Sequence, residues 1–282
     1  MEVTEILVDE LIDIAIREDV GDGDHSSLSC IPFEKMGKVK LLVKQAGVLA
    51  GVAIAKKVFL RIDPATEMEI ILNDGAIIKP GDIAFYAVGR VQSLLKSERL
   101  VLNIMQRMSG VATQTAEYVK LVEGTGAKIL DTRKTTPGMR VLDKQAVKIG
   151  GGENHRMGLY DMVMLKDNHI DFAGGIEAAV ARVKAYLKAE NRSLRIEVEV
   201  RSLEDIKTLL RLDGVHRVMF DNFSVEKTFE AVALVGGKLE TESSGGINKD
   251  TIRSYAEAGV DYISVGALTH QIKSLDLSLK AV

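Results

Sequence analysis

The sequence predicts a two-part α/β protein, with an antiparallel sheet near the N-terminus and an incomplete α/β barrel in the remainder. Closely spaced apolar segments with turn residues between them occupy residues 38–91, and one long helical pattern follows at residues 93–123. After that helix, strand and helix patterns alternate, which is typical of a parallel sheet. A doubly wound open sheet is the second architecture that this alternation allows.

Composition limits the classes of function. The chain has 282 residues and is 46% apolar, enough to bury the core of one large or two medium domains. A net charge of −3 and a pI near 6.0 argue against nucleic acid or an anionic membrane as the main partner. Cys30 is the single cysteine, so no internal disulfide is possible. With no basic leader and no apolar run near roughly 20 residues, we expect a soluble, cytoplasmic protein.

The N-terminal elements follow from periodicity and turn residues. Residues 1–19 place acids between apolar residues at helical spacing, and the turn-forming run GDGDHSS follows. Three strands are expected at residues 38–51, 68–72 and 83–91. In the helix of residues 93–123, one apolar face is expected to be buried, and Gly124 ends the helix. That face comprises Leu94, Val101, Ile104, Met105, Met108 and Ala112.

The domain boundary is expected within or just after this long helix. We therefore expect an N-terminal domain of residues 1–112 and a barrel domain of residues 113–270. The tail, residues 271–282, contains LDLSL, which alternates like a strand and is expected to return to the first domain. Six strands are predicted in the second domain, fewer than the eight of a full TIM barrel. They are AKILDT, DMVMLK, RIEVEV, RVMFD, KLETESS and YISVG.

Polar residues follow these predicted strands, where the loops of parallel βα units form active sites. One such residue alone, such as Asp131 or Asp221, could simply cap the next helix. Polar residues after all of these strands, gathered at one rim of the sheet, predict a binding or active site. Its cations would form a pocket for a multiply anionic small molecule, because arginine binds carboxylates bidentately. They are Arg133, Lys134, His155, Arg156 and Lys166.

Carboxylates and glycines add a second kind of ligand. Glu197 and Glu199 share one face of their strand, and burial there would require cationic partners. Glu199 and Asp221 suit ribose hydroxyls or a magnesium ion carried by phosphate groups. The turns at residues 243–247 and at Gly266 come after the last two strands, where barrels commonly bind phosphate through backbone N–H groups. Together, the cations, carboxylates and glycine turns predict a site that binds a sugar phosphate beside an acidic small molecule.

Long motifs in the chain resemble those of the quinolinate phosphoribosyltransferases, also called nicotinate-nucleotide pyrophosphorylases (carboxylating). The resemblance runs from the REDVGDGD loop to the LDLSL tail. It is carried, in order, by DTRKTTPGMR, GGGENHRMGLYDMVMLKDNHI, IEVEV, MFDNF, ESSGGI and YISVGALTH.

This resemblance implies an N-terminal α/β sandwich and an open α/β barrel of six or seven strands. It implies an enzyme of NAD synthesis that moves phosphoribose from phosphoribosyl pyrophosphate to quinolinate with magnesium. Pyrophosphate, carbon dioxide and nicotinate mononucleotide would be the products. It also implies a homodimer, or a higher assembly of dimers, whose active sites are each completed by the neighbouring subunit.

The resemblance also assigns roles to residues. Arg133, His155, Arg156 and Lys166 would bind the dicarboxylate, with Thr132 and Lys134 contacting the substrates and Lys134 on the pyrophosphate side. Glu199 and Asp221 would address the ribose and magnesium. Lys134, Lys166, Glu199 and Asp221 would be the catalytic residues. The 5′-phosphate would be held by Ser244, Gly245, Gly246 and Gly266, and Arg99 on the long helix would reach into the partner's site.

Some features strain this interpretation. His25 lies in a loop that departs from the family pattern, and Gln271 stands where a serine is common. His155 and Arg156 precede a strand. Residues before a parallel strand are expected at its amino end, which is the opposite end of the barrel from the site. The alternatives are a molybdenum-transport-associated homologue of the same fold, a Schiff-base aldolase using Lys166, and a non-catalytic phosphate-binding regulator.

Overall fold

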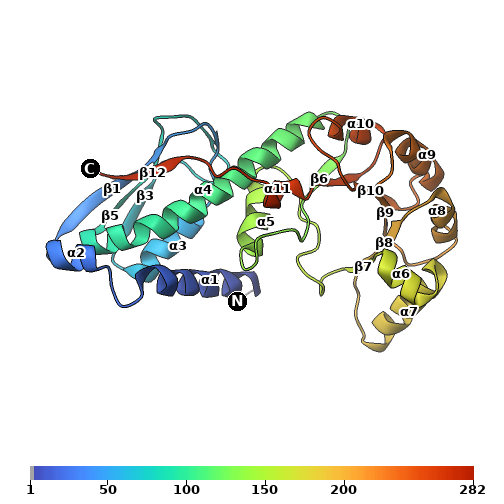
Figure 1. Cartoon of the computed structure of the whole chain (residues 1–282), viewed down its shortest axis with the longest axis horizontal. Helices are drawn as coiled ribbons and strands as arrows, with labels where there is room; N and C mark the ends of the chain where they lie inside the picture. The colour runs from blue at the N-terminus through green and yellow to red at the C-terminus, as the bar shows by residue number, and fades with distance from the viewer. Residues whose placement is uncertain (1–2) are drawn as a thin grey trace. The chain divides into compact units, whose positions relative to one another are not determined.

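A computed structural model describes residues 3–282, which form two compact units (Figure 1). One unit contains the chain up to Ala116 together with Thr135–Gly151 and Leu268–Val282. The other contains Glu117–Lys134 and Gly152–Ala267. Residues 135–151 thus belong with the N-terminal residues, although the sequence places them in the second domain. Their helix is anchored there by Asp143, whose carboxylate accepts two hydrogen bonds from Arg107 at 2.8 and 2.9 Å.

A four-stranded antiparallel sheet, in the order β12-β1-β5-β3, organises the first unit. The strands are β1 (Met36–Val43), β3 (Glu67–Ile70), β5 (Ile83–Arg90) and β12 (Leu277–Ala281). The C-terminal strand β12 pairs with β1, with Leu41 opposite Leu279, so the tail does return to this unit. A two-stranded ribbon is formed by β2 (Gly47–Val48) and β4 (Ile77–Ile78).

The helices of this unit include one that the sequence interpretation missed. We expected only strands and turns in residues 38–91, but Val52–Ile62 forms helix α3. Its buried residues recur at helical spacing, with Val58 and Phe59 four positions after Ile54 and Ala55. Burial of this helical face outweighs the strand preference of the β-branched residues. Other helices of the unit are α1 (Val3–Val20), α2 (His25–Cys30) and α5 (Arg140–Ile149).

Helix α4 (Val91–Leu121) confirms the long helix predicted from the sequence. All six residues of its predicted apolar face are buried, with Val101, Met105 and Met108 completely inaccessible to solvent. Gly124 follows with φ +81°, a left-handed conformation that ends the segment without the steric cost a side chain would add.

The second unit is built on a six-stranded parallel sheet, in the order β6-β11-β10-β9-β8-β7, which forms an open barrel. Figure 1 shows helices along the outer side of these strands. The strands are β6 (Lys128–Leu130), β7 (Val163–Leu165), β8 (Ile196–Val200), β9 (Arg217–Asp221), β10 (Glu240–Ser244) and β11 (Tyr262–Ser264). The helices of this unit are α6 (Asp167–Ala173), α7 (Ile176–Ala189), α8 (Leu203–Leu209), α9 (Val225–Val235) and α10 (Ile252–Glu257). The short helix α11 (Ala267–His270) follows β11, and its residues from Leu268 onward belong to the first unit.

A short parallel bridge explains how His155 reaches the same rim as the strand ends. Glu153 pairs with Leu130 of β6 in parallel, donating its N–H to Ile129 at 2.8 Å and accepting from the N–H of Asp131 at 3.2 Å. The segment therefore runs in the same direction as β6 and emerges beside Asp131. The conflict between the position of His155 in the sequence and its expected place in the site is thereby resolved.

Among residues 3–282, the structure has no helix long and apolar enough to cross a membrane.

Asp63 is expected to be a major stabilising contact of the first unit. Its carboxylate is 1% exposed, accepts from Arg90 Nε at 2.8 Å and from the N–H of Ala65 at 3.1 Å, and its pKa is lowered chiefly by Arg90. Asp63→Asn should lower the free energy of unfolding by about 1.5–3 kcal/mol at pH 7, the usual value of a hydrogen bond to a charged group.

Urea denaturation can check this prediction. Since the folded carboxyl has a lowered pKa, its contribution is present above the unfolded value near 3.8 and is lost as the pH falls below it. Asp9→Asn removes an exposed ion pair to Lys57 and serves as the control, with an expected change within about 0.5 kcal/mol. Equal losses in the two variants would contradict the assignment.

Candidate active site

A pocket of about 430 Å³ lies within the second unit at the carboxyl ends of the barrel strands. This volume is in the range of small-molecule sites. Every predicted binding residue except Arg99 lines it. These are Thr132, Arg133, Lys134, His155, Arg156, Lys166, Glu199, Asp221, Ser244, Gly245, Gly246 and Gly266.

Side chains alternate between the two faces of each strand, and those on the interior face line the pocket. Lys166, Glu199, Asp221 and Ser244 stand at or just beyond the ends of four strands and point into the pocket. Alternate residues of a strand share a face, so a second layer lies two residues earlier on each strand. Met164 and Met219 of that layer form an apolar part of the wall. The face of β8 that carries Glu197 and Glu199 is the interior one, because Glu199 lines the pocket, and both carboxylates are buried.

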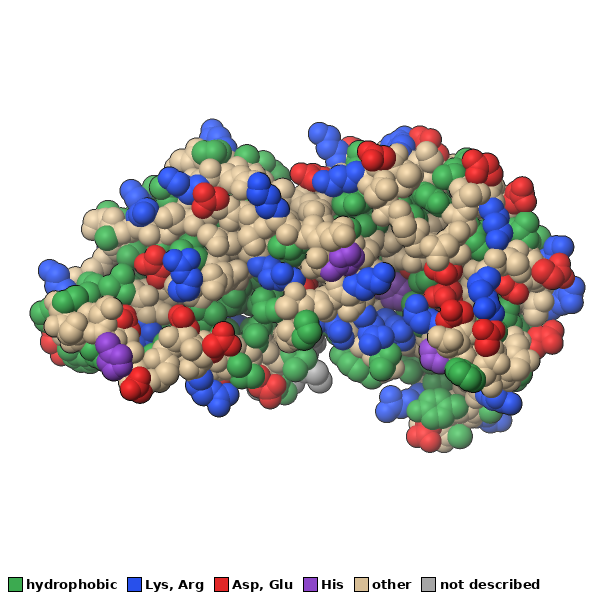
Figure 2. Space-filling model, in the orientation of Figure 1, with side chains coloured by type: hydrophobic (Ala, Val, Ile, Leu, Met, Phe, Trp, Pro, Cys, Tyr) green, Lys and Arg blue, Asp and Glu red, His purple; other side chains and the backbone are tan. Residues whose placement is uncertain are grey.

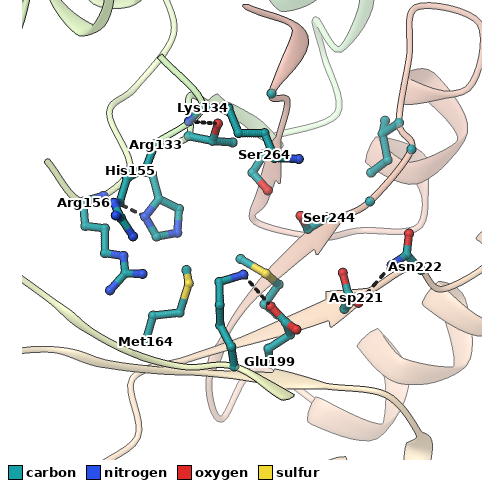
Figure 3. A pocket seen from close by; sticks show the side chains of 17 residues that line it. Arg133, Lys134, His155, Arg156, Met164, Glu199, Asp221, Asn222, Ser244 and Ser264 are labelled. Carbon is teal, nitrogen blue, oxygen red and sulfur yellow. Dashed lines mark hydrogen bonds and ion pairs between the residues drawn. The ribbon is translucent and has the colours of Figure 1, made fainter. Parts of the chain in front are cut away.

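One side of the pocket is cationic (Figure 3). Arg133, Lys134, His155 and Arg156 lie together there, and Glu199 and Asp221 lie on the opposite side. The pKa of the half-buried Arg156 is lowered, first by burial and then by the charge of nearby Arg133. In Figure 2, Lys and Arg side chains also gather beside Asp and Glu where Figure 1 shows β7 and β8. A guanidinium group whose charge is disfavoured by burial and by a neighbouring cation is suited to binding an anion.

The opposite side of the pocket supplies oxygen ligands. The Lys166 ammonium lies 3.0 Å from Glu199 Oε2, so the cationic partner required by the buried Glu199 comes from the neighbouring strand end. Asp221 Oδ2 accepts a hydrogen bond from the Asn222 side chain at 2.9 Å. These carboxylates can accept hydrogen bonds from hydroxyl groups or coordinate a hard cation.

The turn after β10 brings backbone close to the pocket. Gly245 has φ +99°, and a Cβ built there would lie 2.2 Å from Asn222 Oδ1 and 3.0 Å from the backbone nitrogen of Asn222. Neither the conformation nor the space allows a side chain. Gly246, with φ +63°, continues the turn. Successive glycines of this kind leave N–H groups accessible to an anion such as phosphate.

Beneath His155 lies a buried charged layer formed by Glu197, Arg217 and Glu242. Arg217 Nη1 lies 2.9 Å from Glu242 Oε2, and His155 Nε2 lies 3.0 Å from Glu197 Oε2 and 3.5 Å from Glu242 Oε2. Burial raises the pKa of both carboxyl groups to about 7. Both glutamates are completely buried, so the nearby charge of Arg217 and its hydrogen bond to Glu242 must offset part of the loss of water.

Some lining residues escaped the sequence interpretation. They are Met164, Met219 and Ser264. Met164, Met219 and Ser264 stand two positions before Lys166, Asp221 and Gly266, so period-two alternation from the predicted residues would have found them. Asn222 has φ +55°, an uncommon conformation that sequence does not reveal.

Outside the pocket lining lie Arg99, His25 and Gln271. Arg99 is exposed on α4 in the first unit. His25 is exposed at the start of α2, with its Nε2 3.3 Å from Asp22. Gln271 is also exposed.

Comparisons with known proteins cover nearly the whole chain. Residues 24–109 match the N-terminal domain of quinolinate phosphoribosyl transferase, and residues 111–280 match its C-terminal domain. The nicotinate-nucleotide pyrophosphorylase [carboxylating] of Oryza sativa subsp. japonica is 43% identical, over 96% of this chain and 76% of that protein. The probable enzyme of the same name from Bacillus subtilis is 39% identical, over 96% and 92%.

A solved structure agrees with these sequence matches. The crystal structure of NadC from Streptococcus pyogenes superposes with a TM-score of 0.92 and 38% identity, covering 100% of this chain and 99% of that one. None of these matches favours the molybdenum-transport-associated homologue or the Schiff-base aldolase. The chain therefore belongs to the quinolinate phosphoribosyltransferase family.

Proposed function

We propose that this protein transfers phosphoribose from phosphoribosyl pyrophosphate to the ring nitrogen of quinolinate, with loss of carbon dioxide, to give nicotinate mononucleotide and pyrophosphate. The observation that carries the proposal is one pocket in which Arg133 and Arg156 face Glu199 and Asp221 beside the Gly245 turn. The family membership of the chain supports the same reaction.

Quinolinate would bind on the cationic side. Its two carboxylates match Arg133 and Arg156, whose planar guanidinium groups can each donate two hydrogen bonds, and Lys166 adds a third positive charge. The apolar Met164 beside them suits an aromatic ring. A monocarboxylate would leave one of the two guanidinium groups without an anionic partner.

Phosphoribosyl pyrophosphate would occupy the other side of the pocket. Its 5′-phosphate would be held by Ser244, Gly246 and Gly266 around the turn at Gly245, and its ribose hydroxyls by Glu199 and Asp221. Lys134 would face the pyrophosphate. The roles of these residues follow from the kind of group each offers and from its place in the pocket lining.

Magnesium fits the oxygen donors of this side. Glu199 and Asp221 would hold the ion together with substrate phosphate oxygens, because in residues 3–282 neither belongs to a cluster of three potential metal ligands. When bound, the ion would neutralise charge on the leaving pyrophosphate. Such sharing between carboxylates and phosphate oxygens is the usual way in which proteins hold magnesium.

The residues can then stabilise the transition state without a covalent intermediate. As the pyrophosphate bond breaks, positive charge develops on the ribose, where Glu199 and Asp221 stabilise it, and Lys134 stabilises the departing anion. Holding both substrates in one pocket removes much of the entropic cost of their meeting. After transfer, the adjacent carboxylate would leave as carbon dioxide and its bonding electron pair would stay on the ring carbon. The neighbouring positive pyridinium nitrogen would stabilise that carbanion until the carbon takes a proton from water.

A direct assay tests the proposal. Purified protein with magnesium and phosphoribosyl pyrophosphate is given either quinolinate or nicotinate, and pyrophosphate and carbon dioxide are measured. We expect both products with quinolinate in equal amounts and neither with nicotinate. Turnover of nicotinate alone would show that the protein catalyses a non-decarboxylating reaction instead. Absence of turnover with either acid would overturn the proposal.

We further propose a homodimer in which Arg99 enters the neighbouring subunit's site. Arg99 is an exposed cation that does not line the pocket of its own chain, and the family resemblance motivates this placement. Arg99→Ala and Lys166→Ala chains should each be nearly inactive alone. Refolded together in equal amounts, they should recover about a quarter of the wild-type activity, because half of the dimers are mixed and each carries one intact site. No recovery would contradict a shared site.

A further inference from the structure

Asn222 lies directly after β9, beside the Asp221 carboxylate and the turn at Gly245 (Figure 3). All three residues line the substrate pocket. In residues 3–282, Asn222 with φ +55° and Asn191 with φ +50° are the residues other than glycine that have a positive φ. Glycine would adopt this left-handed backbone at lower steric cost, so the backbone alone does not require a side chain at position 222.

The contacts of the Asn222 side chain fix the orientation of its amide. Nδ2 donates a hydrogen bond to Asp221 Oδ2 at 2.9 Å. An ionised carboxylate only accepts hydrogen bonds, so the amide nitrogen must face Asp221 and Oδ1 must face away from it. Gly245 lies on that other side, where a Cβ built on it would be 2.2 Å from Asn222 Oδ1 and 2.6 Å from Asn222 Cγ. The amide therefore fills the space between the carboxylate and the turn.

The main chain around Asn222 is held in place. Its N–H donates to the carbonyl oxygen of Ser244 at 2.9 Å, which extends the pairing that places Asp221 opposite Ser244. The next residue, Phe223, is buried, and its carbonyl oxygen accepts a hydrogen bond from the Tyr255 hydroxyl at 2.8 Å. These contacts on both sides give the Asn222 amide a fixed base from which to orient its neighbour.

We propose that Asn222 is a positioning residue for Asp221, whose amide, packed against Gly245, holds one carboxylate oxygen so that the other is directed at the ribose and its magnesium ion. This inference rests on the proposed function. There, Asp221 binds the same sugar whose 5′-phosphate is held at the Gly245 turn. The amide between them sets the spacing of the two groups, so the site recognises ribose and phosphate as one unit.

Loss of the amide should affect one substrate and spare the other. The Asp221 side chain is only partly buried, and without the donor it can adopt other rotamers. Some of the binding energy of the sugar phosphate must then be used to order that side chain. Quinolinate would bind at Arg133 and Arg156 on the cationic side of the pocket, so its binding should not change.

Asn222→Gly tests this role, because glycine keeps the left-handed backbone and should fold while the amide is lost. Calorimetric titration with phosphoribosyl pyrophosphate and magnesium, without quinolinate, measures Kd in the absence of turnover. We expect Kd to rise about tenfold, as for loss of one hydrogen bond to a charged group. KM for quinolinate should change less than about twofold.

Asn191→Gly is the matched control. Asn191 has nearly the same φ, is exposed after α7 and lies outside the pocket lining. The substitution therefore makes the same change in backbone freedom without touching the site. It should leave Kd for phosphoribosyl pyrophosphate within about twofold of the wild-type value.

An Asp221→Ala background shows whether Asn222 acts through Asp221. With no carboxylate left to hold, Asn222→Gly should change Kd by less than about threefold in that background. A tenfold loss in both backgrounds would overturn the inference, as would an unchanged Kd for Asn222→Gly alone. Wild-type protein that bound no phosphoribosyl pyrophosphate would overturn the proposed function, and this inference with it.

Discussion

Lys166→Ala is expected to lower kcat/KM for quinolinate by about ten- to a hundredfold. Lys166 extends from the end of β7 into the pocket and lies 3.0 Å from Glu199 Oε2. Its removal deletes one cation that would face the substrate and leaves a nearly buried carboxylate without its ammonium partner. Interactions of charged groups in such settings are worth about 1.5–3 kcal/mol, which corresponds to this range of rates.

Steady-state kinetics with each substrate varied in turn can measure this effect. Lys207→Ala is the matched control, because Lys207 is an exposed lysine of α8 that pairs with Glu204 and does not line the pocket. It should change kcat/KM by less than about twofold. If the two lysine variants behaved alike, Lys166 would have no role in the reaction.

Gly245→Ala is expected to raise KM for phosphoribosyl pyrophosphate about thirtyfold or more. An alanine Cβ would meet Asn222 side-chain atoms at 2.2 and 2.6 Å and the backbone nitrogen of Asn222 at 3.0 Å. The turn must therefore move, and a residue forced into an unfavourable backbone region costs about 1–3 kcal/mol before any displacement is counted. A shifted turn would misplace the N–H groups that are proposed to hold the 5′-phosphate.

Gly237→Ala separates strain from the effect on the site. Gly237 has φ +75° with open space around it and lies after α9, outside the pocket lining. It should lower thermal stability through backbone strain alone, and so by less than Gly245→Ala, and leave KM for both substrates within about twofold. Should Gly245→Ala lose stability while keeping a wild-type KM for phosphoribosyl pyrophosphate, the phosphate assignment of this turn would be wrong.

The strand pattern shows why most of the pocket lining could be predicted. The segment RVMFD coincides with β9, and Asp221 closes it with its side chain in the pocket. Apolar runs that end in polar residues mark the carboxyl ends of parallel strands, and those ends meet at one rim whatever the details of packing. Lys166, Glu199 and Ser244 were found by the same reasoning.

Other features depended on contacts between distant segments. The helix α3 was missed because its β-branched residues favour a strand locally, whereas packing of its apolar face decides for a helix. The place of His155 depends on the pairing of Glu153 with Leu130, which local sequence does not encode. Residues 135–151 join the first unit through contacts such as that of Asp143 with Arg107.

The sequence by itself determined the parallel barrel, the charged residues at its strand ends and the family to which they belong, because hydrophobic period and motif are local properties of the chain. Only the tertiary structure decided that Glu197, Arg217 and Glu242 share one buried layer and that His155 contacts it through Nε2. The charge that a side chain carries depends on which groups surround it in space, and β8, β9 and β10 bring those groups together from separate parts of the chain.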